Sequence, residues 1–360
     1  MKTGKVKLLL NVAAVLLCLG FAACSKKSDP IVPVVKTELT VAITAAKLLL
    51  TTTFEGVAAG NYIKGSQAVL NTAVTAAQAV VDDATATQIM VTNATVALNA
   101  AITAYGTQLV TAIDPTNLVG QWTFDQIPTA SVGAVVKDYS GNGRDGTMKT
   151  GHAFWGAGNV TLTADRYGVA GKALRFDKGS NVEIPYNTAL NPASISISLW
   201  AKADVNNPIV NNQYMIAMNR WNGFKLNFQD SPKAFMTVKA SNAGATTIYD
   251  RDNASPLVTQ GQWWHIVVTF GGGNMIFYLN GIMVKTWTDT PGTAFSLSAN
   301  PVNLVFGQDL PTSVYVASPD TSPFYVNWGG FYIGAMDEVR IYKSVLTASQ
   351  VTSIYTVEKP

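Results

Sequence analysis

The sequence is poor in the residues that build disulfides, metal centres and charged surfaces. Its 360 residues include two cysteines and two histidines, and charged residues make up only 13%. Two cysteines exclude a disulfide framework and a cysteine-rich zinc module, and two histidines leave little room for a multi-histidine metal centre. The low charge excludes an acidic disordered chain and a strongly basic nucleic-acid-binding protein, so we expect no nucleic acid partner.

Glutamate is scarce as well, and its placement argues against catalysis. The glutamates are Glu38, Glu55, Glu183, Glu338 and Glu358. Glycosidases need two carboxyl groups roughly 5 to 10 Å apart, and on a strand the neighbours Asp337 and Glu338 would point to opposite faces. Neither His152 nor His265 accompanies a Gly-x-Ser-x-Gly nucleophile elbow. We expect no enzyme activity, and a glycoside hydrolase or polysaccharide lyase is the alternative.

The first residues resemble a bacterial lipoprotein signal. Lysines at positions 2, 5 and 7 precede an apolar run over residues 8–20, and Phe21-Ala22-Ala23-Cys24 follows. The run has the length of a signal-peptide segment and is short for a membrane span. The resemblance implies removal of residues 1–23, lipid attachment to Cys24, a tether over residues 24–35, and a lipid as the only membrane contact. An uncleaved anchor helix is the alternative.

Removal of that segment changes the net charge. It lowers Lys plus Arg from 25 to 22, which equals the 22 Asp plus Glu, so the mature chain is formally neutral. A neutral chain suits an uncharged ligand, because binding such a ligand needs no strong electric field.

Proline and tryptophan divide the remaining chain. No proline lies between Pro33 and Pro115, and all eight tryptophans follow Pro115. We therefore expect two domains, over residues 36–113 and 117–358. In the first, apolar residues recur at helical spacing within residues 39–50, 70–81 and 91–105, which predicts a small three-helix bundle.

The bundle sequence resembles a known module of bacterial surface proteins. Residues 60–66 (GNYIKGS) and the two helices after them are similar to FIVAR modules. Such modules are generally interpreted as spacers and sometimes as sugar-binding units. The few aromatic residues, Phe54, Tyr62 and Tyr105, favour the spacer interpretation.

The second domain shows strand patterns and turn signals. Residues 195–199 alternate between apolar residues and serines, which predicts a half-buried strand. Asn280-Gly281 between two apolar runs predicts a hairpin. Short strands with Gly, Pro and Asn turns predict an antiparallel β-sandwich over residues 117–358. Thr347 and Gln350 have capping-box spacing and predict a short helix to about residue 355.

Ordered motifs in this domain resemble those of LamG-like, concanavalin A-like domains. They lie at residues 122–125 (WTFD), 138–146, 171–176, 195–200, 264–270, 278–281 and 335–342. The resemblance implies an antiparallel jelly roll. A lipoprotein with this module resembles those that Bacteroidetes place on the outer membrane for glycan capture. The Glu-x-Asp-x-x-Glu strand of related glucanases is absent.

A structural calcium ion is a further expectation. Asp138 and Asn142 flank a glycine-rich turn, where oxygen ligands can converge on Ca²⁺. Asp337 shares a strand with Val339 and Ile341 and is expected on the same, inward face, where a carboxylate needs a metal or an ionic partner. LamG-like relatives often hold calcium in this region. Asp125 in the N-terminal strand is the fourth candidate, because the resemblance implies that the first and last strands are neighbours. The alternatives are an Asx turn at Asp138 and Asn142, and an ion pair at Asp337 with Arg175 or Arg340.

Three clusters outside the core motifs combine aromatic rings with planar polar groups. They are Tyr214, Arg220, Trp221 and Asn222; Tyr249, Arg251 and Asp252; and Tyr325 and Trp328. Sugars stack their CH faces on rings and bond their hydroxyls to amides and carboxylates, so these residues are the candidate carbohydrate-binding residues. Each cluster could instead be rim packing.

The sequence therefore predicts a lipid-anchored, outer-membrane protein that binds a glycan on its jelly roll and uses the bundle as a spacer. Other outer-membrane glycan-uptake proteins are further expected partners. An adhesion or structural protein that binds a protein partner is the alternative. We expect the cell surface as its location, although Lys26 and Lys27 stand where surface-exported lipoproteins are typically acidic.

Overall fold

The computed structural model describes residues 33–56, 58–206, 212–229 and 231–360. The predicted signal peptide, the predicted lipidation site Cys24 and most of the predicted tether lie outside these residues. Among the helices of the described residues, none combines the length and the hydropathy that a bilayer span requires.

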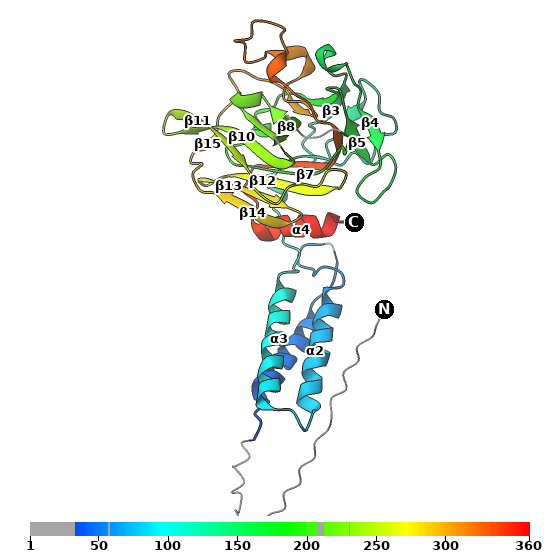
Figure 1. Ribbon diagram of the computed structural model, residues 1–360, viewed down its shortest axis with the longest axis vertical. Coiled ribbons are helices and arrows are strands. Elements are labelled where there is room, and N and C mark those ends of the chain that lie inside the picture. Colours follow the sequence, from blue (N-terminus) through cyan, green and yellow to red (C-terminus); the bar gives the residue numbers. More distant parts are fainter. Residues whose placement is uncertain (1–32, 57, 207–211, 230) are drawn as a thin grey trace, which may run out of the picture.

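Three helices open the described chain: α1 (Thr37–Thr52), α2 (Ser66–Asp82) and α3 (Gln88–Gly106). They run in alternating directions and form an elongated bundle below the rest of the molecule (Figure 1). Their buried side chains recur at helical spacing and are Leu39, Ala42, Ile43, Ala46, Leu70, Val74, Ala77, Val91, Leu98 and Tyr105. The predicted three-helix bundle is confirmed, and this buried seam supplies most of its stability, because Thr and Val are mediocre helix formers.

The rest of the chain folds into two packed antiparallel sheets, as predicted. The first has eight strands in the order β14-β13-β12-β7-β17-β5-β4, with β1 beside β17. Its strands are β1 (Leu118–Trp122), β4 (Thr161–Thr163), β5 (Ala173–Phe176), β7 (Ile195–Ala203), β12 (Trp264–Gly271), β13 (Asn274–Leu279), β14 (Ile282–Trp287) and β17 (Gly334–Tyr342).

The second sheet has nine strands in the order β11-β10-β9-β8-β16-β6-β3-β2, with β15 beside β10. Its strands are β2 (Val135–Val136), β3 (Gly146–Lys149), β6 (Asn181–Ile184), β8 (Gln213–Met218), β9 (Phe224–Gln229), β10 (Lys233–Asn242), β11 (Ala245–Asp252), β15 (Thr293–Ala294) and β16 (Leu304–Phe306). Short 3₁₀ helices in the connections are η1 (Pro115–Asn117), η2 (Ala153–Trp155), η3 (Thr188–Leu190), η4 (Arg220–Asn222), η5 (Thr312–Val314) and η6 (Val326–Trp328).

The hydrophobic core fills the space between the two sheets. Along β9, Phe224, Leu226 and Phe228 belong to this core. Because side chains alternate along a strand, Lys225 and Asn227 point to the opposite, outer face of the nine-stranded sheet.

The predicted hairpin is present between β13 and β14. Its two turn residues, Asn280 and Gly281, both have positive φ angles, +49° and +77°, as a type I′ turn requires. A Cβ atom at position 281 would lie 2.9 Å from Tyr355, so the glycine also allows the C-terminal helix to approach the turn.

Strand β7 differs from the prediction, because both of its faces are buried. Ser196 and Ser198 have no exposed surface. Ser196 Oγ donates to the Ser344 carbonyl oxygen at 2.6 Å and accepts from the Leu346 N–H at 3.0 Å. The half-buried prediction was wrong, because the C-terminal segment covers the face that alternation assigns to solvent.

Helix α4 (Ala348–Glu358) begins at the predicted capping box of Thr347 and Gln350 and runs three residues further than expected. It packs on the outer face of the eight-stranded sheet. The buried contact residues there are Val267, Tyr278, Tyr342, Leu346 and Val351.

Helix α4 also joins the sandwich to the bundle. Ser353 Oγ accepts a hydrogen bond from the Thr111 N–H at 2.8 Å, and Gln350 Nε2 donates to the Ala112 carbonyl oxygen at 3.0 Å. The bundle, α4 and the sandwich thus follow one another along the long axis (Figure 1). Since α4 covers the eight-stranded sheet, the outer face of the nine-stranded sheet points away from the bundle.

Candidate functional site

Aromatic residues from two predicted clusters meet on the outer face of the nine-stranded sheet. The ring centroids of Trp221 in η4 and Trp328 in η6 lie 5.9 Å apart, and those of Tyr325 and Trp328 lie 5.8 Å apart. Trp328 is 45% exposed, and Asn327 Nδ2 donates to the Tyr325 hydroxyl at 2.7 Å. We call Trp221, Tyr325 and Trp328 the aromatic surface. An exposed indole beside planar polar groups can stack on a sugar ring.

A buried ion pair holds the segment that carries this surface. Arg220 Nε donates to Asp309 Oδ2 at 2.5 Å, and one terminal nitrogen of Arg220 donates to the carbonyl oxygens of Pro323 and Tyr325 at 2.9 and 3.2 Å. The Tyr315 hydroxyl donates to the other oxygen of Asp309. Burial, the Asp309 charge and this bond together raise the pKa of Tyr315 well above its ordinary value.

This arrangement changes the role expected of Arg220. Its side chain is 1% exposed, so it offers almost no surface to a ligand. Its guanidinium instead joins β8 and η4 to the segment that ends in η6. Tyr214, also predicted to contact sugar, is 1% exposed and lies beneath the same segment. Both residues support the aromatic surface from below, and Asn222 remains half-buried at its edge.

A lysine that the sequence reasoning missed lies beside these residues. Lys225 is 3% exposed, and its Nζ atom lies 5.1 Å from the ring centre of Tyr214, 5.7 Å from that of Trp221 and 6.0 Å from that of Phe235. We call the three rings the lysine cage. Burial lowers the pKa of Lys225, against the opposing charges of Asp250 and Asp309. The signal in the sequence was the alternation over residues 224–228, which points a charged residue outward between two aromatic clusters.

The third predicted cluster lies at the edge of the sandwich. Tyr249 is buried, and its hydroxyl donates to the Pro291 carbonyl oxygen at 3.0 Å. Arg251 pairs with Asp289 at 2.6 Å and stacks 5.1 Å from the Trp287 ring. These contacts tie β11 to the β14–β15 connection, so Tyr249 and Arg251 do not join the aromatic surface.

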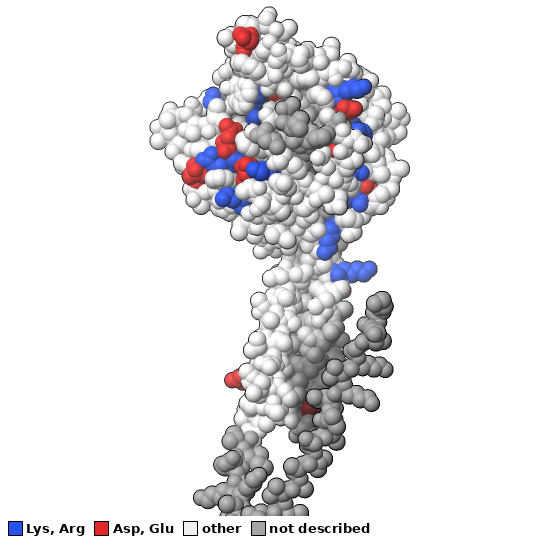
Figure 2. Space-filling model, in the orientation of Figure 1, with Lys and Arg blue, Asp and Glu red and all other residues white. Residues whose placement is uncertain are grey.

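Charges of both signs surround the outer part of β10 and β11. Asp252 lies 3.8 Å from Lys233 there. Figure 2 shows blue and red side chains intermixed over this part of the sandwich, whereas the bundle below shows few charges. This face therefore offers polar contacts without a strong field of one sign.

The predicted calcium ligands Asp138 and Asn142 are bonded to protein groups. Asp138 accepts the backbone N–H groups of Gln121 at 3.0 Å and of Ser140 and Arg144 at 2.9 Å. Burial acts to raise the pKa of Asp138, but these bonds outweigh it and lower the pKa. Asn142 Nδ2 donates to the Leu118 carbonyl oxygen at 2.9 Å. The pattern is that of the alternative, a carboxylate that caps a turn.

Asp337 faces the opposite way from the prediction. A β-bulge interrupts the register of β17 and β7 between Asp337 and Arg340, and Glu338 within it has φ +51°. The bulge leaves Val339 in the core and turns Asp337 to the outer face, where it pairs with Arg166 at 2.5 Å. Strict alternation fails here because a bulge inserts one extra residue.

The bulge also places Asp337 and Glu338 on the same side, since Arg166 contacts both, at 2.5 and 3.9 Å. Asp125 is half-buried nearby in the chain after β1, and its backbone oxygen accepts from Lys172 Nζ at 2.6 Å. Within the described residues, no group of three or more His, Cys, Asp or Glu side chains is arranged to hold a metal. The four candidate ligands do not fit a calcium ion as they stand.

A serine and a histidine lie in contact beneath α4, where a substrate has no access to them. Ser198 Oγ and His265 Nε2 lie 2.9 Å apart, and both residues are 0% exposed beneath α4. Burial lowers the pKa of His265 to about 4, so the imidazole is neutral at pH 7. The contact is part of the packing of α4.

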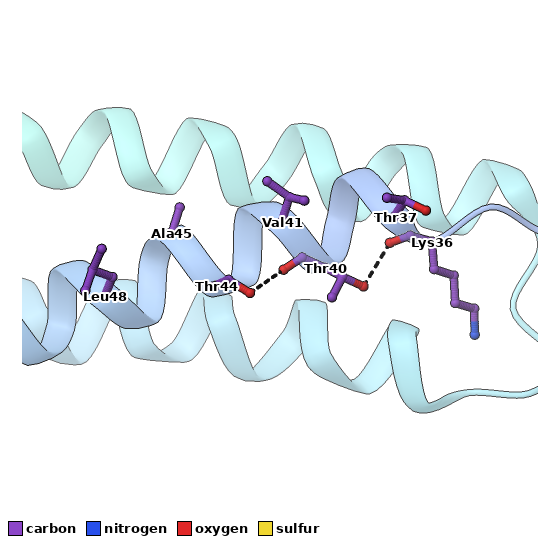
Figure 3. Close-up of a pocket in the computed structure, with 7 residues that line it drawn as sticks. All are labelled: Lys36, Thr37, Thr40, Val41, Thr44, Ala45 and Leu48. Carbon is purple, nitrogen blue, oxygen red and sulfur yellow. Dashed lines mark hydrogen bonds between the residues drawn. The ribbon is translucent and has the colours of Figure 1, made fainter.

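A shallow groove follows the exposed side of α1 (Figure 3). Its lining residues are Lys36, Thr37, Thr40, Val41, Thr44, Ala45 and Leu48. Thr40 and Thr44 donate their hydroxyls to the backbone oxygens of Lys36 and Thr40 at 3.0 and 2.9 Å. With these hydroxyls bonded internally, the groove has few polar groups for a ligand.

Comparison with known proteins adds the family of the sandwich. Residues 176–352 match the model of the Laminin_G_3 family, described as the concanavalin A-like lectin/glucanases superfamily. The two sheets form a concanavalin A-like β-sandwich, and the matched residues are similar to this family. All three residues of the aromatic surface and Lys225 lie inside the matched segment, whereas Asp125 and Asp138 precede it. No curated protein matches the chain.

Solved structures are similar to the chain at low identity. Domain 4 of an extracellular arabinanase from Geobacillus stearothermophilus, solved in complex with arabinotriose, is 21% identical over 66% of this chain and 98% of its own, with a TM-score of 0.46. The binding domain of Paraclostridial mosquitocidal protein 1 is 17% identical over 67% of this chain and 52% of its own, with a TM-score of 0.46.

Proposed function

We propose that this protein captures a glycan at the cell envelope, with the lectin/glucanase domain as the binding module and the helical bundle as a spacer. The observation that carries the proposal is the aromatic surface, where Trp328 is 45% exposed beside Trp221 and Tyr325. The buried Arg220–Asp309 pair fixes this surface in place before a ligand arrives, which lowers the entropic cost of binding. The lectin/glucanase family is consistent with a carbohydrate ligand.

The order of the parts supports a role for the bundle as a spacer. Helix α1 begins at the end of the bundle that lies far from α4 (Figure 1). The predicted lipid anchor at Cys24 precedes this end. Helix α2 has 17 residues, and at 1.5 Å per residue it spans about 25 Å. Anchored in this way to the outer membrane, the protein would direct the aromatic surface away from the lipid, and we propose the cell surface as its location.

The test is a glycan array with the full chain after position 23, carrying Cys24→Ala to prevent lipidation. We expect binding to at least one glycan, and a loss of roughly 2- to 10-fold in affinity for Trp328→Ala, the size of one stacking contact. Tyr139→Ala is the matched control, because Tyr139 is 43% exposed and belongs neither to the aromatic surface nor to the residues around Lys225. It should bind like the parent.

Two other outcomes decide between the functions left open by the sequence. Release of reducing sugar from a bound glycan would establish a hydrolase instead of a binding protein. An absence of glycan binding across the array would overturn the proposal and leave the adhesion alternative.

A further inference from the structure

The lysine cage has a feature that packing alone does not explain. Lys225 is 3% exposed, and three aromatic rings surround its ammonium group at 5.1 to 6.0 Å. Among the residues that the structure describes, none accepts a hydrogen bond from Lys225 Nζ or lies within ion-pair distance of it. An ammonium group has three donors, so the donors of Lys225 remain available to a ligand at the surface of the sheet.

The two carboxylates whose charges act on Lys225 are already engaged elsewhere. Asp309 is bonded to Arg220 and to the Tyr315 hydroxyl. Asp250 accepts from Thr237 Oγ1 at 2.5 Å, across the strand from Lys225. Both charges act on Lys225 only from a distance. The cage therefore retains a cation whose hydrogen-bonding capacity is open to an anionic ligand.

We propose that Lys225 binds the carboxylate of an acidic sugar, so that the captured glycan is a uronic-acid polysaccharide. The inference rests on the proposed function and names the chemical class of its ligand. Trp221 belongs to both the lysine cage and the aromatic surface. One sugar residue could therefore place its carboxylate on Lys225 while a neighbouring ring stacks on Trp328.

The surroundings of the cage favour a sugar carboxylate over a more highly charged anion. Asp250 is exposed two strands from Lys225, and Asp252 follows on the same face. These carboxylates repel an anion in proportion to its charge, so they repel a singly charged sugar carboxylate less than a doubly charged phosphate. They also accept hydrogen bonds from the hydroxyls of a sugar. Trp221 and Phe235 remain partly exposed, so the ammonium lies just beneath the surface of the sheet.

This inference revises the expectation drawn from the neutral net charge. A net charge of zero describes the long-range field of the whole chain. A single desolvated ammonium acts at short range, where a charge-assisted hydrogen bond is stronger than a neutral one. Selectivity for an acidic sugar therefore needs no basic surface.

The test compares acidic polysaccharides with their neutral counterparts. Binding of polygalacturonate, alginate and hyaluronan oligosaccharides is measured by calorimetry, each beside its carboxyl-reduced form. We expect at least one acidic form to bind more tightly than its reduced form. Lys225→Met, which keeps the chain length inside the cage, should weaken that binding about 10- to 100-fold and leave the reduced form unchanged.

The matched control is Lys202→Met. Lys202 lies 5.2 Å from the Trp263 ring on the other sheet, so its loss removes one charge and one cation–π contact away from the cage. It should bind like the parent. If Lys225→Met binds the acidic form like the parent, or loses acidic and reduced forms equally, the inference is overturned.

Failure of the inference can be told apart from failure of the proposed function. Binding of reduced or neutral glycans without any preference for carboxylates would overturn the role of Lys225 and leave glycan capture standing. No binding to any polymer in this panel or on the glycan array would overturn both.

Discussion

On the outer face of the eight-stranded sheet, the two arginines beneath α4 pair with carboxylates. Beneath α4, Arg340 lies 2.6 Å from Glu338 and 2.5 Å from Glu358, and Arg166 lies 2.5 Å from Asp337. This network fixes the C-terminal helix to the sheet.

The outer face of the nine-stranded sheet differs in one cation. Arg220 is paired with Asp309 at 2.5 Å, as the arginines of the other sheet are paired. Lys225 has aromatic neighbours in place of a carboxylate. A cation that is paired internally contributes to a fixed geometry, whereas a buried cation without a partner stores unsatisfied hydrogen-bonding capacity. We therefore assign Arg220 and the paired arginines of the other sheet to the fold, and Lys225 to ligand binding.

The largest expected effect comes from breaking a paired arginine on either face. Arg220→Met leaves Asp309 buried without its cation. Arg340→Met removes the cation that pairs with Glu358 and the nearer of the two that pair with Glu338. Each should lower the free energy of unfolding by about 3–5 kcal/mol, as removal of one partner of a buried ion pair does. Urea denaturation of both variants measures this loss.

Lys225→Met is the contrasting variant in the same experiment. Because it removes an unpaired charge, the only interaction lost is the cation–π contact, and we expect a change in unfolding free energy below about 1 kcal/mol. A loss as large as that of Arg220→Met would remove the distinction between the two kinds of cation.

His265 gives the next largest effect, and it depends on pH. Burial lowers its pKa to about 4 in the folded chain, whereas an unfolded histidine has a pKa of about 6.5. Between these values the unfolded chain binds a proton that the folded chain does not, so stability falls as the pH drops from 6.5 to 4. This group alone should contribute a loss of about 3 kcal/mol.

The measurement is urea denaturation at pH 6.5 and pH 4 for the parent and for His265→Gln. Other carboxylates titrate in the same range, so the informative quantity is the difference between the two proteins. The glutamine variant should lose less stability over this interval. Equal losses would show that His265 is protonated in the folded chain.

Repetitive features of the fold could be predicted from the sequence. The helical spacing of residues 39–50, 70–81 and 91–105, the Asn280-Gly281 turn and the Thr347 capping box each depend on a local pattern, and each is present. Local patterns persist because the forces behind them act over a few residues.

Features set by distant segments could not be predicted in this way. Ser198 is buried because α4 covers it, and Asp337 faces outward because a bulge at Glu338 shifts its strand. Trp221 and Trp328 were both candidate residues, but the sequence did not predict that they lie side by side. Their contact depends on the bond between Arg220 and Asp309, which are 89 positions apart in the chain. Lys225 could not be predicted, because the three rings around it lie on separate elements, β8, η4 and β10.

The smallest expected effect is that of calcium on the melting temperature. The turn at Asp138 is the part of the molecule that decides it. Its carboxylate oxygens already accept hydrogen bonds from Gln121, Ser140 and Arg144. A cation would have to displace these donors, and the loop gains little from the exchange. We therefore expect the calorimetric melting temperature to be the same in excess EDTA and in millimolar Ca²⁺. A higher melting temperature with calcium would mean that Asp138 and Asn142 rearrange around the ion, and the turn would then be a metal site like those expected from LamG-like relatives.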